Sequence, residues 1–195
     1  VQTCALPISN VMFSVSVMKS HISYFCYYSQ GKIVQAHETS GEASEIAEES
    51  GDMFSKGIAL VSYGISSYGL GFNDESIEYL QKGIECCEKA NQIIWTAFAN
   101  TYLGEIYYEI DELQASKYHF ERAIELFKKN NLLVFYVYLN KAALLRINVI
   151  KNREKAIMNC LEDWTKSVQM KLFSGLMLRY IAEVFLEIDK DKSHH

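Results

Sequence analysis

The chain has 195 residues, 49% of them hydrophobic, and a net charge of −5 from 24 acidic and 19 basic side chains. This length and apolar content suit a folded protein with its own core. Charges of both signs are interspersed and no basic stripe occurs, so we expect no nucleic-acid partner. The longest nearly apolar run, residues 11–18, is too short to span a membrane, and we expect no membrane association.

Reactive side chains show no recognisable functional spacing. The five cysteines lack CxxC spacing, which indicates free thiols in a reducing cytoplasm. The histidines show no metal-ligand spacing, and no glycine-rich phosphate loop precedes a helix. We therefore predict no metal, no cofactor and no catalytic activity.

Residues 1–8 read VQTCALPI and are predicted to be foreign to the protein. Back-translated as GTT CAG ACG TGT GCT CTT CCG ATC, they resemble the ligated adapter of a short-read sequencing method over the whole octapeptide. A native loop or the end of a signal peptide is the alternative, but no basic region precedes the segment. We therefore expect that the gene was taken from an environmental or assembled read. We also expect the octapeptide to be extended and dispensable.

Hydrophobic periodicity predicts pairs of helices from residue 11 onward, and the single proline, Pro7, leaves them uninterrupted. The first helix of each pair is apolar on nearly every side and is predicted to lie inside, whereas the second carries a polar face. The first helices are predicted at 11–29, 53–70, 93–110, 132–149 and 171–188, and the second at 33–50, 74–90, 112–129 and 153–167.

Turn and cap residues support these boundaries. Gly51, Asn91 and Asn131 follow the second helices, where a residue in the left-handed conformation is usually glycine or asparagine. Asp111 is predicted as an N-cap residue, and Asn152 as the cap of a later helix.

The helices repeat with a period of forty residues, because residues 76–85 (SIEYLQKGIE) align with residues 116–125 (SKYHFERAIE). Small residues recur at the same step in the second helices, at Ala36, Ser76, Ser116 and Ala156. Such positions allow close approach of helices. The sequence therefore predicts an all-α fold of stacked antiparallel helix pairs.

The spacing of several residues resembles that of the tetratricopeptide family. The family's leucine, glycine, tyrosine, aromatic and alanine positions correspond to Leu103, Gly104, Tyr107, Phe120 and Ala123. The family's first-helix tryptophan is replaced by Asn100, and the period exceeds the usual length of about thirty-four residues. The resemblance covers about residues 11–190 and implies a right-handed α–α superhelix. It looks like the longer-helix type found in regulatory regions of large bacterial signalling proteins.

The resemblance also implies a domain organisation. Residues 9–195 are expected to form one repeat domain truncated at both ends, with units at about 11–50, 51–90, 91–130 and 131–170 and a half unit at 171–195. A solenoid needs polar caps, yet the terminal helices contain apolar residues such as Val15, Phe25, Leu178 and Phe185. We predict exposed apolar faces at both ends and self-association through them.

Two functions remain open at this point. The first is a cytoplasmic binding scaffold that engages a peptide or protein domain without catalysis. The second is a regulatory arm of a larger bacterial signalling enzyme or transcription regulator, linked to a nucleotide cyclase, ATPase or kinase module. A neighbouring domain of one of these kinds in the same reading frame would favour the second.

In solenoids of this family the first helices line a concave groove, which implies a partner-binding site. Its predicted residues, related by the forty-residue step, are Tyr28, Val61, Ile65, Tyr68, Thr101, Glu105, Tyr108, Glu109 and Lys141. Three tyrosines would form a ladder beside two carboxylates and select a segment with apolar anchors and some positive charge. The alternative is that the tyrosines pack between neighbouring first helices, since aromatic stripes are often core.

Overall fold

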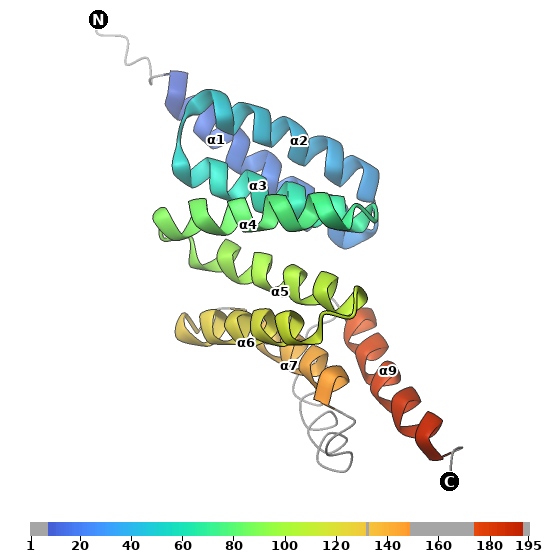
Figure 1. Cartoon of the computed structure of the whole chain (residues 1–195). Coiled ribbons are helices and arrows are strands. Elements are labelled where there is room, and N and C mark those ends of the chain that lie inside the picture. Colours follow the sequence, from blue (N-terminus) through green and yellow to red (C-terminus); the bar gives the residue numbers. More distant parts are fainter. Residues whose placement is uncertain (1–7, 132, 149–173, 193–195) are drawn as a thin grey trace, which may run out of the picture. The chain divides into compact units, whose positions relative to one another are not determined.

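The computed structural model describes residues 8–131, 133–148 and 174–192 (Figure 1). Within these ranges every element is a helix and no strand occurs, which confirms the all-α class for this part of the chain. The elements are α1 (Ile8–His21), the π-helix η1 (Ile22–Tyr27), the 3-10 helix η2 (Tyr28–Gln30), α2 (Ile33–Ser50), α3 (Met53–Gly69), α4 (Asn73–Lys89), α5 (Ile93–Glu109), α6 (Leu113–Lys129), α7 (Val134–Asn148) and α9 (Ser174–Lys192).

Helices α2 to α6 begin and end within one residue of their predicted bounds. The octapeptide prediction falls mostly outside the described residues, although Ile8 begins α1. The predicted helix at 153–167 and the predicted cap Asn152 also lie outside them.

The first helix differs from its prediction, because a π-helix and a 3-10 turn replace its second half. In this segment two consecutive rings, those of Tyr24 and Phe25, contact Phe98 of α5 with centroid distances of 5.0 and 6.2 Å. A regular α-helix places consecutive side chains about 100° apart, which separates them around the axis. The wider π turn lets both rings reach the same partner.

The turns between helices share one backbone conformation. A residue with positive φ follows each helix from η2 to α6, at Gly31 (75°), Gly51 (66°), Gly71 (85°), Asn91 (55°), Asp111 (64°) and Asn131 (48°). The prediction for Gly51, Asn91 and Asn131 is confirmed.

The prediction of Asp111 as an N-cap is wrong. Its own N–H donates to the carbonyl of Tyr108 at 3.2 Å, and the N–H of Glu112 donates to Tyr107 at 2.8 Å. These two bonds form the Schellman motif that ends α5, in which a left-handed residue is required and aspartate is tolerated. The N-cap of α6 is Glu112, which makes no side-chain cap bond.

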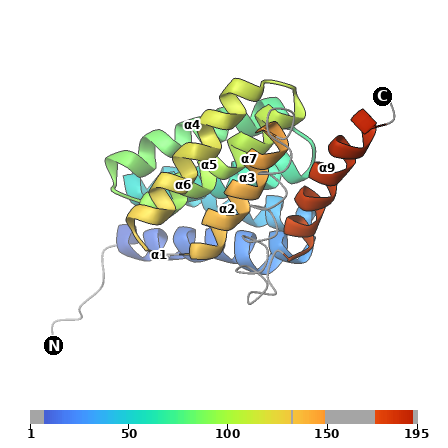
Figure 2. The same ribbon diagram turned by 90° about the horizontal axis from the view of Figure 1, so that it is seen from below.

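The chain forms two compact units, Val1–Ile106 and Tyr107–His195, and the division falls within α5. In the first unit α1 to α4 lie side by side (Figures 1 and 2). Residues 57–67 of α3 are buried except for Tyr63, whereas α2 and α4 each bury mainly one stripe. The two stripes occupy positions forty residues apart, Ala36, Ser40, Ala43 and Ala47 on α2 and Ser76, Leu80, Gly83 and Cys87 on α4. The predicted inner position is confirmed for α3 and the predicted outer position for α2 and α4, whereas α1 exposes large apolar residues such as Met18.

Helices α3 and α4 approach closely because both carry glycine at their contact. A Cβ atom on Gly83 would lie 2.6 Å from Cγ2 and 3.0 Å from the backbone nitrogen of Val61. One on Gly64 would lie 2.8 Å from Cγ of Leu80. The Ser76 hydroxyl donates to the Gly64 carbonyl at 2.7 Å. Small residues at the recurring positions therefore do permit a close helix contact, as predicted.

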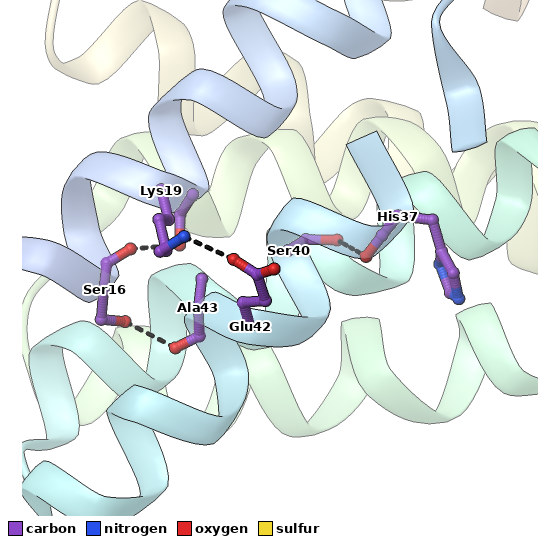
Figure 3. A network of polar contacts seen from close by, with 7 residues as sticks. Ser16, Lys19, His37, Ser40, Glu42 and Ala43 are labelled. Carbon is purple, nitrogen blue, oxygen red and sulfur yellow. Dashed lines mark hydrogen bonds and ion pairs between the residues drawn. The ribbon is translucent and has the colours of Figure 1, made fainter. Parts of the chain in front are cut away.

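Helices α1 and α2 are joined by polar contacts (Figure 3). The hydroxyl of Ser16 donates to the carbonyl of Ala43 at 2.8 Å. Lys19 forms an ion pair with Glu42 at the edge of the same contact. The serine bond satisfies a polar group inside a tightly packed seam, where an unpaired hydroxyl would be costly.

In the second unit α6 buries a stripe that lies forty residues after the buried stripe of α4. These positions are Ser116, Phe120, Ala123 and Phe127. Helix α7 packs against α6, where the rings of Phe127 and Tyr136 stack at 5.1 Å, and α9 packs against α7. Among the described residues no helix is both long and apolar enough to cross a membrane.

Candidate functional site

Four of the predicted groove residues are buried. Val61 and Ile65 on α3 are 0% and 1% exposed, and Thr101 and Glu105 on α5 are each 4% exposed. In this conformation these side chains offer almost no surface to a partner. The forty-residue step places them at corresponding helix positions, but the packing of neighbouring helices covers that side.

The two predicted tyrosines of the first unit are half-buried and share one contact. Tyr28 and Tyr68 each pack against the ring of Tyr102 on α5, with centroid distances of 5.7 and 6.0 Å and interplanar angles of 83° and 66°. Such edge-to-face pairs are worth about 0.5–1.5 kcal/mol each beyond their buried area. The tyrosines are thus joined through Tyr102, which agrees with the alternative in which they pack between first helices.

The rings of η1 and α5 extend this contact into a larger cluster. Tyr24 lies at its centre, 1% exposed, with ring centroids of Phe98 at 5.0 Å and Trp95 at 5.9 Å. We call the cluster the aromatic wall and define it as His21, Tyr24, Phe25, Tyr28, Tyr68, Trp95, Phe98 and Tyr102.

The wall has a buried base and an accessible edge. Trp95, Phe98 and Tyr102 are buried, whereas His21 is exposed and Phe25 is 41% exposed. His21 packs edge-on against Trp95 at 5.2 Å and near the ring of Phe25 at 5.9 Å. Exposed aromatic surface held by buried rings is well suited to binding, since little side-chain freedom is lost when a partner docks.

Sequence reasoning missed the α5 residues of the wall. Trp95, Phe98 and Tyr102 follow one another at helical spacings of three and four. That spacing could have identified them as one face of α5. However, the forty-residue step from Tyr102 leads to Ser62 and Ala142, so the repeat pattern concealed the position.

The remaining predicted residues belong to the second unit. Tyr108 packs against the guanidinium of Arg146, whose Cζ lies 4.2 Å from the tyrosine ring centroid and 3.9 Å from that of Tyr180. Arg146 is 4% exposed and pairs with Glu183 at 3.0 Å. Two ring faces and a carboxylate offset the cost of burying the arginine charge.

Two charged residues of the predicted groove differ in burial. Lys141 is half-buried over the ring of Tyr138 at 5.4 Å, and Glu109 is exposed at the end of α5. Sequence reasoning also missed Arg146, although a single arginine in the apolar helix of residues 134–148 was a usable signal.

Burial shifts the pKa of several titratable groups. It raises the pKa of the Cys87 thiol to about 12, so this cysteine stays protonated and poorly nucleophilic. It lowers the pKa of His119 to about 4, and that ring stacks on Tyr107 at 5.4 Å. Tyr63 has its pKa raised to about 12 by burial and by Glu75. Within the described ranges no group of three or more His, Cys, Asp or Glu side chains could hold a metal ion.

Comparison with known proteins finds no family model and no curated protein that matches the sequence. The geometry offers two notable arrangements, one in each unit. The aromatic wall combines buried support with exposed rings, whereas the stack of Arg146 between two tyrosines is covered and serves to hold α9 on α7. The wall is therefore the stronger candidate for a binding surface.

Proposed function

We propose that the chain is a protein-interaction scaffold built from tetratricopeptide-like repeats of a superhelical solenoid, and that it binds a peptide or protein segment at the aromatic wall. Support for the repeats comes from helix bounds, buried stripes and left-handed turn residues that recur at regular steps. In this proposal the chain has no catalytic role and acts in a reducing cytoplasm.

The observation that carries the proposal is the exposed edge of the wall. Phe25 and His21 present ring surface above Trp95 and Phe98, which hold them in place. A ligand that matches this edge carries apolar or aromatic anchors, and a lysine or arginine would gain from the ring faces. The proposed site omits Val61, Ile65, Thr101 and Glu105 of the predicted groove, because all four are buried.

A displayed library of random peptides tests the proposal directly. Peptides selected on the wild-type chain are synthesised, and their affinity is measured by fluorescence anisotropy. Phe25→Ala is expected to weaken binding by roughly thirtyfold, the loss of about 2 kcal/mol typical of a hot-spot ring.

Phe72→Ala is the matched control, since Phe72 is a phenylalanine 51% exposed outside the wall. Circular dichroism establishes that both variants keep the wild-type helical content. Selection of no peptide, or equal losses in the two variants, would contradict a binding site at the wall.

A further inference from the structure

Tyr63 is the one residue within 57–67 of α3 that is not buried, and its ring packs against two others. Its centroid lies 4.5 Å from that of His37 on α2 and 4.7 Å from that of Tyr79 on α4. Gly41 of α2 lies beside the same ring, since a Cβ atom there would be 3.6 Å from Cε2 of Tyr63. Residue 41 therefore has no side chain to cover this edge, and the three rings form a half-buried surface that joins α2 and α4.

The carboxylate of Glu75 lies at this surface without a cation. It accepts one hydrogen bond from the Ser67 hydroxyl at 3.2 Å and another from the Tyr63 hydroxyl. Burial and this carboxylate raise the pKa of Tyr63 to about 12, so the phenol stays neutral and remains a donor. Both partners of Glu75 are thus neutral, and in the described part of the chain no lysine or arginine forms an ion pair with it. A carboxylate has about four acceptor sites, so roughly two remain for a further donor.

A lysine of the chain already lies at the edge of this surface. The Nζ atom of Lys82 is 5.7 Å from the centroid of the Tyr79 ring, and the same ammonium group pairs with Glu78. A ring face and a carboxylate therefore hold an ammonium group at this position. Lys82 pairs with Glu78 rather than with Glu75, so the second carboxylate keeps its charge uncompensated.

We propose that this surface binds a lysine side chain of a basic protein partner, with the ammonium group beside Glu75 and the rings of Tyr63 and Tyr79. We call it the ammonium site and define it as His37, Tyr63, Glu75 and Tyr79. A compact ammonium group suits it better than a planar guanidinium, because the His37 ring, inclined by 33°, already packs on the Tyr63 ring.

Charge around the ammonium site favours a basic partner. Helix α2 carries five carboxylates and no lysine or arginine, and α4 carries five carboxylates and two lysines. Such a field attracts a positively charged segment and orients it before contact. The ammonium site shares no residue with the aromatic wall, so this proposal is independent of the binding function assigned to the wall.

A fluorescein-labelled peptide of alternating glycine and lysine tests the proposal, and fluorescence anisotropy on the full chain measures its affinity. The same peptide with every lysine acetylated is the control, because acetylation keeps the aliphatic stem and removes the charge. The lysine peptide is expected to bind, and the acetylated peptide to bind roughly tenfold or more weakly.

Two substitutions on α4 locate the binding. Glu75→Gln removes the charge but keeps an acceptor for Ser67 and Tyr63, and should weaken binding by roughly tenfold. Glu85→Gln is the matched control, since it removes the same charge from an exposed position of α4 outside the ammonium site. It should change the affinity by less than about twofold, because an exposed charge away from the ligand is screened.

Lys82→Met should act in the opposite direction. It keeps an unbranched side chain but removes an ammonium group that competes for Tyr79, and it frees the Glu78 carboxylate. Binding of the lysine peptide should therefore strengthen by roughly threefold. Lys89→Met, which removes an exposed lysine near the end of the same helix, is its control and should have a smaller effect.

Several results would overturn the proposal. Equal losses in Glu75→Gln and Glu85→Gln would show attraction to the acidic surface as a whole. Absence of binding, or equal binding of the acetylated peptide, would exclude an ammonium site. A loss in Phe25→Ala as large as that in Glu75→Gln would place the peptide on the aromatic wall.

Circular dichroism on each variant separates loss of binding from loss of folding. Tyr79→Leu provides a second variant of the ammonium site, in which the ring face is lost and every charge is kept. It should also weaken binding of the lysine peptide, and unchanged affinity in this variant would contradict the role of the ring.

Discussion

Substitution of Gly83 by alanine probes the closest helix contact in the first unit. The added Cβ would lie 2.6 Å from Cγ2 of Val61, a residue that is 0% exposed, and 3.0 Å from its backbone nitrogen. Backbone cannot yield as a side-chain end can, so α4 must move away from α3. Gly41 on α2 is the matched control, because its nearest neighbour would be Cε2 of Tyr63 at 3.6 Å, an ordinary contact.

The two substitutions should change stability in opposite directions. Alanine in a helix interior is favoured over glycine by about 1 kcal/mol. Overpacking a close contact costs about 1–3 kcal/mol, and the backbone contact at Gly83 places the cost in the upper part of that range. We therefore expect Gly83→Ala to lose about 1–2 kcal/mol, and Gly41→Ala to gain about 1 kcal/mol.

Urea denaturation followed by circular dichroism measures both changes. The comparison requires equal m-values, since a change in m would signal altered compactness rather than altered stability. If Gly83→Ala stabilises the chain as much as Gly41→Ala does, the close approach of α3 and α4 does not exist.

Two further predictions concern the second unit. The pKa of His119 is lowered from 6.5 to about 4, so its contribution to stability is fully present above pH 6.5 and is lost as pH falls toward 4. His119→Phe should flatten that part of the urea-midpoint profile, and an unchanged profile would show that another group is responsible. Arg146→Lys keeps the charge but loses the planar stack on Tyr108 and Tyr180, and should cost about 1–3 kcal/mol. Leu133→Lys, on an exposed residue, is the control, and equal thermal midpoints for the two variants would refute a stabilising role for the stack.

Sequence alone determined where helices α2 to α6 begin and end. Helix bounds depend on local signals, namely apolar periodicity and residues that adopt positive φ, and Gly51, Asn91 and Asn131 were identified in this way. The local signal failed at Asp111, because aspartate is common both as an N-cap and as a left-handed residue. The hydrogen bond from Glu112 to Tyr107 decides between them, and this bond exists only in the folded turn.

Which residues of the candidate site are buried and which are exposed was determined by the tertiary structure. A forty-residue step assigns residues to equivalent positions on successive helices. It grouped Tyr28 with Tyr68, and both rings contact Tyr102 in the structure. It carries no information about how closely those helices pack, so Val61 and Ile65 were placed on a surface although they are core. The π turn of η1 joins its rings to α5, and this contact between segments far apart in the chain has no signature in either segment alone.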